Sequence, residues 1–241
     1  MDTLDFHSHV GNNKGGPVRT FSNFLSALKL NQVSHSVVFC LNEAQGTVEE
    51  ASFNLLDKAK GHPNLFPFFR FDLNTMTEEK LEEALSKGFR GVKLHPRAQN
   101  FDPLDEKFSW IFDRLSKSGK PVLIHARCEG LERTEPLRLV ELARRFPKMK
   151  LVLGHFGGAL TDVFKQVKEL DNLFLETSIV SSHFVIAEAV KVCGADKILF
   201  GSDAPFSDIE IERLKILKAP FSDEEKEKIL FKNAAKLLGL S

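Results

Sequence analysis

Residues 4–9 read Leu-Asp-Phe-His-Ser-His, a short apolar run that ends in two histidines. Successive side chains of a β-strand point to opposite faces, so His7 and His9 are expected on the same side of this strand. Imidazole nitrogens bind zinc and other first-row metals, and two that share a face can bind one ion. A catalytic metal site usually takes about three or four protein ligands. Further ligands must therefore come from other parts of the chain.

Similar apolar runs rich in Val, Ile, Leu and Phe recur along the sequence and alternate with longer amphipathic segments. This pattern is typical of parallel strands that are buried on both faces and connected by helices. We predict strands near Leu4–His9, Ser36–Cys40, Leu65–Phe71, Gly91–His95, Val122–Ala126, Leu151–His155, Leu173–Thr177 and Ile198–Asp203. Alternation alone fits either a closed barrel or an open doubly wound sheet.

Polar residues at the predicted strand ends favour the barrel. His125 ends Val-Leu-Ile-His, His155 ends Leu-Val-Leu-Gly-His, and Asp203 ends Ile-Leu-Phe-Gly-Ser-Asp. Barrel enzymes assemble their active sites at the carboxyl ends of the strands. Burying four histidines and an aspartate there without partners would be costly. We therefore predict an α/β fold, one (β/α)₈ TIM-barrel domain over residues 1–241, with a metal site at His7, His9, His125, His155 and Asp203.

Local signals mark several helix starts and one loop. Three pairs fit the capping box, in which side chains satisfy free amides of the first helical turn: Thr47 with Glu50, Ser207 with Glu210, and Ser222 with Glu225. The Gly- and Pro-containing segment Gly11–Pro17 follows the first strand directly and is predicted to be a loop over the site.

The amino-acid composition indicates which kinds of binding partner and catalytic residue to expect. Lys plus Arg and Asp plus Glu number 33 each, which gives no indication of nucleic-acid or membrane binding and makes a small molecule the expected partner. The three cysteines are widely spaced, as expected for free thiols in a reducing cytoplasm. No apolar run approaches the roughly 20 residues that span a bilayer. Tyr is absent, so a general acid or base must be another residue type.

The motifs as a set resemble the amidohydrolase superfamily. They are Asp5-Phe-His7-Ser-His9, Gly91-Val-Lys-Leu-His95-Pro, His125, Gly154-His155-Phe-Gly-Gly158, Gly201-Ser-Asp203-Ala-Pro205 and the closing Asn233-Ala-Ala-Lys-Leu-Leu-Gly. They occur in order over almost the whole chain. The most similar branch is the amidohydrolase-related group, which includes metal-dependent hydrolases and aromatic-acid decarboxylases.

The resemblance implies roles for the strand-end residues. His7, His9, His125 and Asp203 would hold one divalent metal ion, most simply zinc. His155 would act as acid or base, or bind a second metal ion. Asp203 would also accept a proton from a metal-activated water. Binuclear members of the superfamily carry a bridging carboxylated lysine near the position of Lys93, so a second ion stays open.

Cationic residues near the strand ends suggest an acidic substrate. Arg70 and Arg127 can recognise a carboxylate through paired donors, as can Arg97, although each is equally well explained as a solvated loop charge. Lys93 and His95 share a face and are further candidates to line the substrate pocket. For His95, a hydrogen-bonded histidine before Pro96 is an equal alternative.

The leading functional hypothesis is metal-dependent hydrolysis of an ester, lactone or amide-type bond in a small, carboxylated molecule. Non-oxidative decarboxylation on the same metal site is the main alternative. Two weaker alternatives are a TatD-type nuclease, whose fourth-strand glutamate is missing here, and a barrel that binds metal without turnover. A homo-oligomer is compatible with the sequence, which leaves the oligomeric state open.

Overall fold

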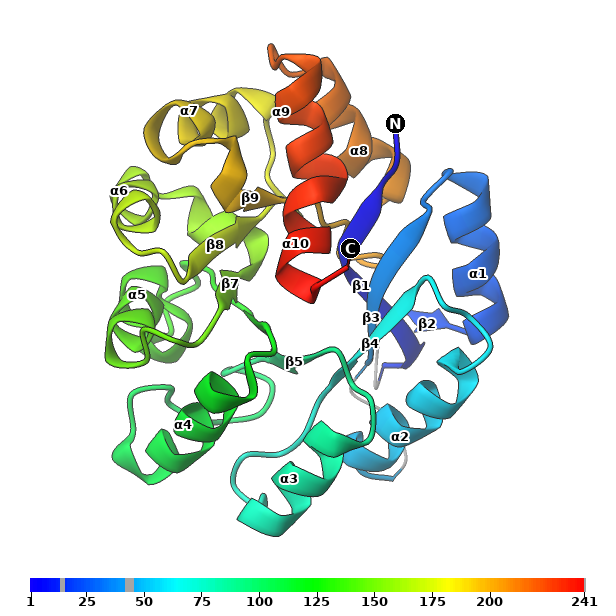
Figure 1. The fold of residues 1–241 in the computed structure, drawn as a ribbon, viewed down its shortest axis with the longest axis vertical. Helices are drawn as coiled ribbons and strands as arrows, with labels where there is room; N and C mark the ends of the chain where they lie inside the picture. The colour runs from blue at the N-terminus through cyan, green and yellow to red at the C-terminus, as the bar shows by residue number, and fades with distance from the viewer. Residues whose placement is uncertain (14–15, 42–45, 241) are drawn as a thin grey trace.

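The computed structural model describes residues 1–13, 16–41 and 46–240. Its strands form one mostly parallel, curled sheet in the order β2-β1-β3-β4-β5-β6-β7-β8-β9, with helices around the outside (Figure 1). The strands are β1 (Leu4–Asn12), β2 (Val18–Arg19), β3 (His35–Cys40), β4 (Leu65–Phe69), β5 (Gly91–Leu94), β6 (Val122–Ile124), β7 (Leu151–Leu153), β8 (Leu173–Glu176) and β9 (Ile198–Leu199).

The first and last parallel strands come together where the sheet curls round. The Phe6 amide donates to the Phe200 carbonyl (2.9 Å), and the Asp203 amide donates to the His7 carbonyl (2.7 Å). The His9 amide completes the contact by donating to the Ala204 carbonyl (2.8 Å). These bonds satisfy backbone groups that an open sheet edge would leave unpaired. The segment after β9 is therefore joined directly to β1.

Each predicted apolar run contains a strand, but several strands end earlier than expected. Arg70, His125, His155 and Asp203 follow β4, β6, β7 and β9 instead of ending them. At two of these positions the backbone leaves the extended region, with φ of 52° at His155 and 55° at Asp203. Extended pairing cannot continue through such left-handed residues. These four polar residues thus lie just beyond the carboxyl ends of their strands.

The prediction of a loop over Gly11–Pro17 is wrong in part. β1 continues through Asn12, and β2 folds back on it antiparallel, with Gly11 opposite Arg19 and Asn12 opposite Val18. This pairing uses backbone groups of β1 that extend beyond its parallel partner β3, which reaches only Val10. Residues 14 and 15 of the segment lie outside the described residues.

The helices cover the outer face of the sheet. They are α1 (Phe21–Leu30), α2 (Val48–Ala59), α3 (Glu78–Ser86), α4 (Ser109–Ser118), α5 (Pro136–Arg145), α6 (Thr161–Glu169), α7 (His183–Cys193), α8 (Ile209–Lys218), α9 (Asp223–Glu227) and α10 (Asn233–Leu238). Among the described residues, every helix is too short or too polar to cross a lipid bilayer.

Two of the three predicted capping boxes are confirmed. Thr47 caps α2 with Glu50, and Ser222 caps α9 with Glu225. The prediction for Ser207 is wrong, because Asp208 caps α8 and accepts hydrogen bonds from two amides of its first turn. The Ser207 hydroxyl instead donates to the buried Glu212 carboxylate at 2.8 Å.

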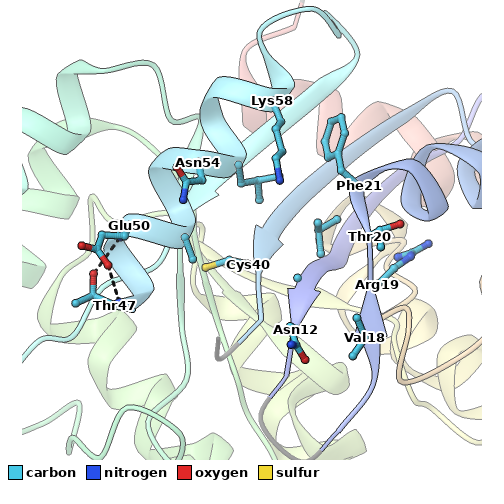
Figure 2. Close-up of a pocket in the computed structure, with 14 residues that line it drawn as sticks. Asn12, Val18, Arg19, Thr20, Phe21, Cys40, Thr47, Glu50, Asn54 and Lys58 are labelled. Carbon is cyan, nitrogen blue, oxygen red and sulfur yellow. Dashed lines mark hydrogen bonds between the residues drawn. The ribbon is translucent and has the colours of Figure 1, made fainter. Parts of the chain in front are cut away.

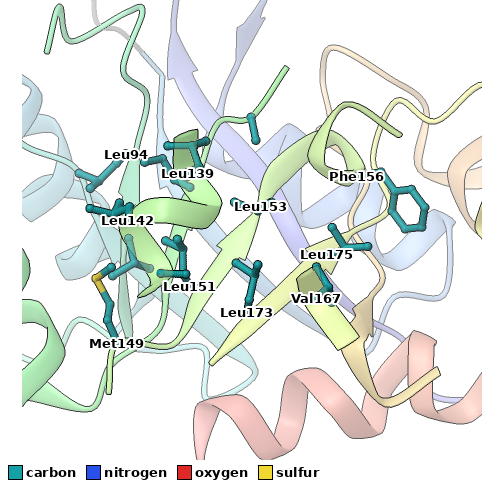
Figure 3. Packing of buried hydrophobic residues seen from close by; sticks show 14 of the residues in the cluster. Leu94, Leu139, Leu142, Met149, Leu151, Leu153, Phe156, Val167, Leu173 and Leu175 are labelled. Carbon is teal, nitrogen blue, oxygen red and sulfur yellow. The ribbon is translucent and has the colours of Figure 1, made fainter. Parts of the chain in front are cut away.

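The core has an outer and an inner part. Between the sheet and its helices, Leu139 and Leu142 of α5 belong to the same apolar cluster as Leu151 and Leu153 of β7 (Figure 3). A second cluster joins strand residues such as Leu123 to α10. Full burial of one such aliphatic side chain contributes about 1.5–3 kcal/mol. This packing fixes the strand ends that carry the polar residues.

Candidate metal centre

Five residues that the sequence singled out lie together at the carboxyl ends of the parallel strands. They are His7 and His9 on β1, His125 after β6, His155 after β7 and Asp203 after β9. None of the five is more than 8% exposed. Residues separated by almost two hundred positions thus form one buried polar cluster, as the parallel topology requires.

Asp203 is the centre of this cluster. Its Oδ1 lies 3.1 Å from Nε2 of His7 and 2.9 Å from Nε2 of His9. Ligand atoms of His7, His155 and Asp203 all lie within 4.8 Å of one another. Within the described ranges, these three residues form the group that is compact enough to hold a metal ion.

His9 and His125 lie at the edge of that group. His9 reaches it through Asp203, whereas Nδ1 of His125 lies 2.9 Å from Nε2 of His155. The other ring nitrogen of His125 faces a Glu129 carboxylate oxygen at 3.3 Å, and its ring stacks on His95 with 3.8 Å between centroids. His155, which the resemblance gave as acid or base or as a ligand of a second metal ion, has left-handed backbone and belongs to the compact group.

Glu176, the last residue of β8, was missed by the sequence analysis. It is fully buried, and its Oε2 lies 2.7 Å from Nδ1 of His7. The same oxygen accepts a hydrogen bond from the Ser178 hydroxyl at 3.0 Å. A carboxylate in contact with a histidine nitrogen orients the ring and selects its tautomer. A charged residue at the end of a predicted buried strand was the signal available in the sequence.

Both ring nitrogens of His7 face charged groups. Nδ1 lies 2.7 Å from Oε2 of Glu176, while Nε2 lies 3.1 Å from Oδ1 of Asp203 and 3.1 Å from Nζ of Lys93. The pKa of His7 is raised: burial and Lys93 lower it, but Glu176 and Asp203 outweigh both. The two carboxylates therefore favour positive charge at this ring.

Burial favours the neutral form of the other three imidazoles of the cluster. Burial lowers the pKa of His9 to about 3 and that of His125 to about 2, and it holds the pKa of His155 well below its usual range. Burial would raise the pKa of Asp203, but His7 and His9 hold it well below its ordinary value. Neutral imidazoles and an ionised carboxylate are the forms that bind metals.

The donor set fits a divalent metal ion. Imidazole nitrogens and one carboxylate suit zinc, manganese and related ions. In addition, Nδ1 of His9 is buried and has no hydrogen-bond partner among the described residues. A buried polar atom without a partner is costly, and such atoms in native proteins commonly mark functional sites.

Lys93 adds a buried amine to the cluster. It is 1% exposed, and its Nζ lies 3.1 Å from Nε2 of His7 and 5.0 Å from the centroid of the Phe39 ring. Burial lowers the pKa of this amine to about 7. Burial also lowers the pKa of its neighbour His95, and that imidazole is therefore neutral.

A cavity of about 290 Å³ opens above the cluster. Four cationic residues line it, namely Arg70, Lys93, Arg97 and Arg127. Arg70 is buried and donates to the Cys40 carbonyl (2.7 Å), and Arg97 forms an ion pair with Glu129 (2.7 Å). Arg127 is exposed, and its side chain makes no hydrogen bond or ion pair with the residues that the structure describes. The cavity also contains the apolar side chains Leu41, Ile179 and Phe206.

A second cavity, of about 420 Å³, lies between β1, β2, α1 and α2 (Figure 2). Asn12, Phe21, Cys40 and Lys58 are among its lining residues. It contains none of the five residues of the metal cluster. The residues of the metal cluster therefore face the smaller of these two cavities.

The family model for amidohydrolases matches residues 19–240. The chain belongs to the amidohydrolase family. The resemblance predicted from the motifs is thereby confirmed, and it covers nearly the whole sequence.

Curated relatives of this chain include decarboxylases and a dihydroorotase. The 2-amino-3-carboxymuconate-6-semialdehyde decarboxylase of Caenorhabditis elegans is 26% identical over 148 residues, which cover 53% of this chain and 37% of the relative. The dihydroorotase of Helicobacter pylori (strain HPAG1) is 29% identical over 171 residues, which cover 65% of this chain and 48% of the relative. The chain thus spans half or less of these relatives' length.

Solved structures support the fold. The crystal structure of 5-carboxyvanillate decarboxylase from Sphingomonas paucimobilis has a TM-score of 0.82 at 15% identity, covering 100% of this chain and 99% of that chain. A dihydroxybenzoic acid decarboxylase from Polaromonas sp., solved with manganese and an inhibitor, has a TM-score of 0.78 at 16% identity, covering 99% and 97%. At such identities the likeness establishes the architecture only.

Proposed function

We propose that this protein is a metal-dependent hydrolase that acts on an ester, lactone or amide-type bond of a small, carboxylated molecule. The observation that carries the proposal is the compact group of His7, His155 and Asp203 at the floor of a cavity lined by three arginines and Lys93. A Lewis-acid site and a cationic pocket are what hydrolysis of an anionic substrate requires.

We expect His7, His9, His125 and Asp203 to form the shell that holds the ion, with His155, whose ligand atom lies within 4.8 Å of those of His7 and Asp203, beside it as acid and base. A divalent ion in this shell would polarise a substrate carbonyl and make a water molecule more acidic. Zinc is our first expectation for the ion. Manganese is an alternative because dihydroxybenzoic acid decarboxylase of similar fold was solved with it. The shell is expected to stand on a closed (β/α)₈ barrel, with β2 as an added hairpin strand.

The chain's own residues would handle protons and charge. Asp203 is an ionised carboxylate at the cluster centre, so it can accept the proton that a water molecule loses on attack. His155, which contacts His125 and the Ser178 hydroxyl, can take this proton from Asp203 and pass it to the leaving group. Arg127 and Arg70 are proposed to bind the substrate carboxylate, since a guanidinium offers paired donors to it. Lys93 and His95 are proposed to line the substrate side of the pocket.

Decarboxylation of a small acid is the second candidate. Two curated relatives, the Caenorhabditis elegans enzyme and a gamma-resorcylate decarboxylase from Polaromonas, carry out this kind of reaction by name. The cationic lining of the pocket would orient the carboxylate that is lost, and His155 would supply the replacing proton.

A substrate panel separates the two reactions. Protein reconstituted with Zn²⁺ or Mn²⁺ would be given lactones, cyclic amides and aromatic acids, and acid and carbon dioxide release would be followed. Hydrolysis predicts one new acid group and no carbon dioxide, whereas carbon dioxide release with uptake of a solvent proton establishes the second candidate. Asp203→Asn should be inactive, while His62→Ala, a change outside the cluster, should keep full activity. Protein that binds neither ion would contradict both candidates.

A further inference from the structure

Arg19 is a buried cation that neither the sequence motifs nor the proposed chemistry accounts for. It ends β2 and is only 6% exposed. Arg19 is among the residues that line the second cavity, and in Figure 2 its guanidinium lies on the opposite side of β2 from Cys40 and Lys58. The guanidinium carbon lies 5.1 Å from the centroid of the Phe24 ring of α1.

One nitrogen of this guanidinium bridges the two segments that meet at the seam of the sheet. Nη1 donates to the Ser8 hydroxyl at 3.0 Å, to the Ala204 carbonyl at 3.2 Å and to the His9 carbonyl at 3.4 Å. Ser8 and His9 belong to β1, whereas Ala204 lies beyond β9. Arg19 thus adds a charged side-chain contact to the backbone hydrogen bonds and the Ser8–Ala204 bridge that join these segments.

Asp203 directly precedes Ala204, and its backbone conformation is unusual. Its φ of 55° lies in the left-handed region, which residues with a side chain adopt rarely. Such a conformation persists only where surrounding contacts hold it. On one side the Asp203 amide donates to the His7 carbonyl. On the other side the next carbonyl, of Ala204, accepts from both the His9 amide and Arg19.

We propose that Arg19 is a positioning residue that clasps the Ala204 carbonyl to β1 and thereby holds Asp203 in the conformation that faces His7 and His9. A charge-assisted hydrogen bond is about twice as strong as a neutral one, so a guanidinium is well suited to this task. The inference rests on the proposed metal centre for its functional meaning. The backbone clasp itself does not depend on a metal.

Two measurements on Arg19→Met test the proposal. The first is the dissociation constant for Zn²⁺ and for Mn²⁺, which should rise about 10- to 100-fold, as when a residue supporting a metal ligand is lost. The second is amide hydrogen exchange in metal-free protein. The Asp203 and His9 amides should exchange on the order of tenfold faster once the charged donor is gone.

Arg138→Met is the matched control, because it removes another arginine, one that forms two hydrogen bonds with Asp102 away from the centre. It should change neither the metal dissociation constants nor the exchange of those two amides. Arg19→Lys keeps a cationic donor and should give intermediate values. If Arg19→Met does not fold, Arg19→Lys carries the test by the same two measurements.

Wild-type dissociation constants and unchanged exchange in the Arg19 variants would overturn the clasp. Failure of the wild-type protein to bind either ion would instead contradict the proposed function. In that case the amide exchange rates still decide whether Arg19 holds Asp203, so the two failures are distinguishable.

Discussion

At the scale of single residues, the Glu176 carboxylate contacts His7 of the proposed metal centre from outside the compact group. It selects the tautomer of His7 by contacting Nδ1, and this leaves Nε2 directed toward Asp203. A residue of this kind is expected to be nearly as important for metal affinity as the ligands themselves.

Glu176→Gln should therefore weaken metal binding about 10- to 100-fold without unfolding the protein. The amide keeps the shape of the side chain but removes the charge that favours a cation at His7. The dissociation constant for Zn²⁺ or Mn²⁺ is the measurement. Glu212→Gln is the control, because Glu212 is also a buried carboxylate but contacts Lys215 and Ser207 rather than an imidazole. Equal affinity in Glu176→Gln and wild type would rule out this role.

A second test at this scale uses the glycine that packs against Glu176. A Cβ on Gly201 would overlap the Glu176 carboxylate, so Gly201→Ala should displace it and lower both thermal stability and metal affinity. Gly61→Ala is a suitable control, since nothing lies within 4 Å of a Cβ there and the backbone is not left-handed. Similar melting temperatures and affinities for the two variants would contradict the packing argument.

At the scale of elements, local capping rules predict where a helix starts, but the residue that fits the pattern is not always the one that caps the helix. Ser207 matched the capping pattern, yet Asp208 caps α8 because the Ser207 hydroxyl is engaged by Glu212 across the turn. Tertiary contacts can override a local preference in this way.

Asp208→Ala should lower the free energy of unfolding by about 0.5–2 kcal/mol, because two amides of the first turn of α8 lose their acceptor. Urea denaturation measures the change. Asp162→Ala removes an exposed aspartate in the first turn of α6 that caps nothing. It should cost no more than about 0.5 kcal/mol. A larger loss in Asp162→Ala than in Asp208→Ala would show that the cap is assigned wrongly.

At the scale of the whole molecule, stability and the metal centre are expected to be coupled. The cluster draws on β1, β6, β7 and β9, so an ion bound there would link segments that are remote in sequence. A ligand that binds only the folded state adds about 2.7 kcal/mol of stability at one hundred times its dissociation constant.

Zn²⁺ or Mn²⁺ should accordingly raise the melting temperature of protein stripped with a chelator, and EDTA should reverse the rise. Calorimetry with and without the ion measures the difference. Asp203→Asn should melt at the same temperature in both conditions. If neither ion changed the melting temperature of the wild-type protein, a metal centre spanning these strands would be contradicted.

Much of this architecture could be read from the sequence. Apolar runs of strand length located every parallel strand, because burial on both faces imposes that composition. Polar residues at the ends of those runs identified His7, His9, His125, His155 and Asp203, because such residues are costly to bury without a purpose. The motif set indicated the amidohydrolase family, which the match over residues 19–240 confirms.

Only the tertiary structure decided how these residues meet. The backbone is left-handed at His155 and Asp203, and this affects which way their side chains point. The periodicity of apolar residues in a sequence does not reveal such local turns. The contact of Glu176 with His7 and the clasp of Arg19 across the seam join segments 169 and 185 residues apart. Sequence determines which side chains reach the edge of the sheet, whereas the curling of the sheet determines which of them touch.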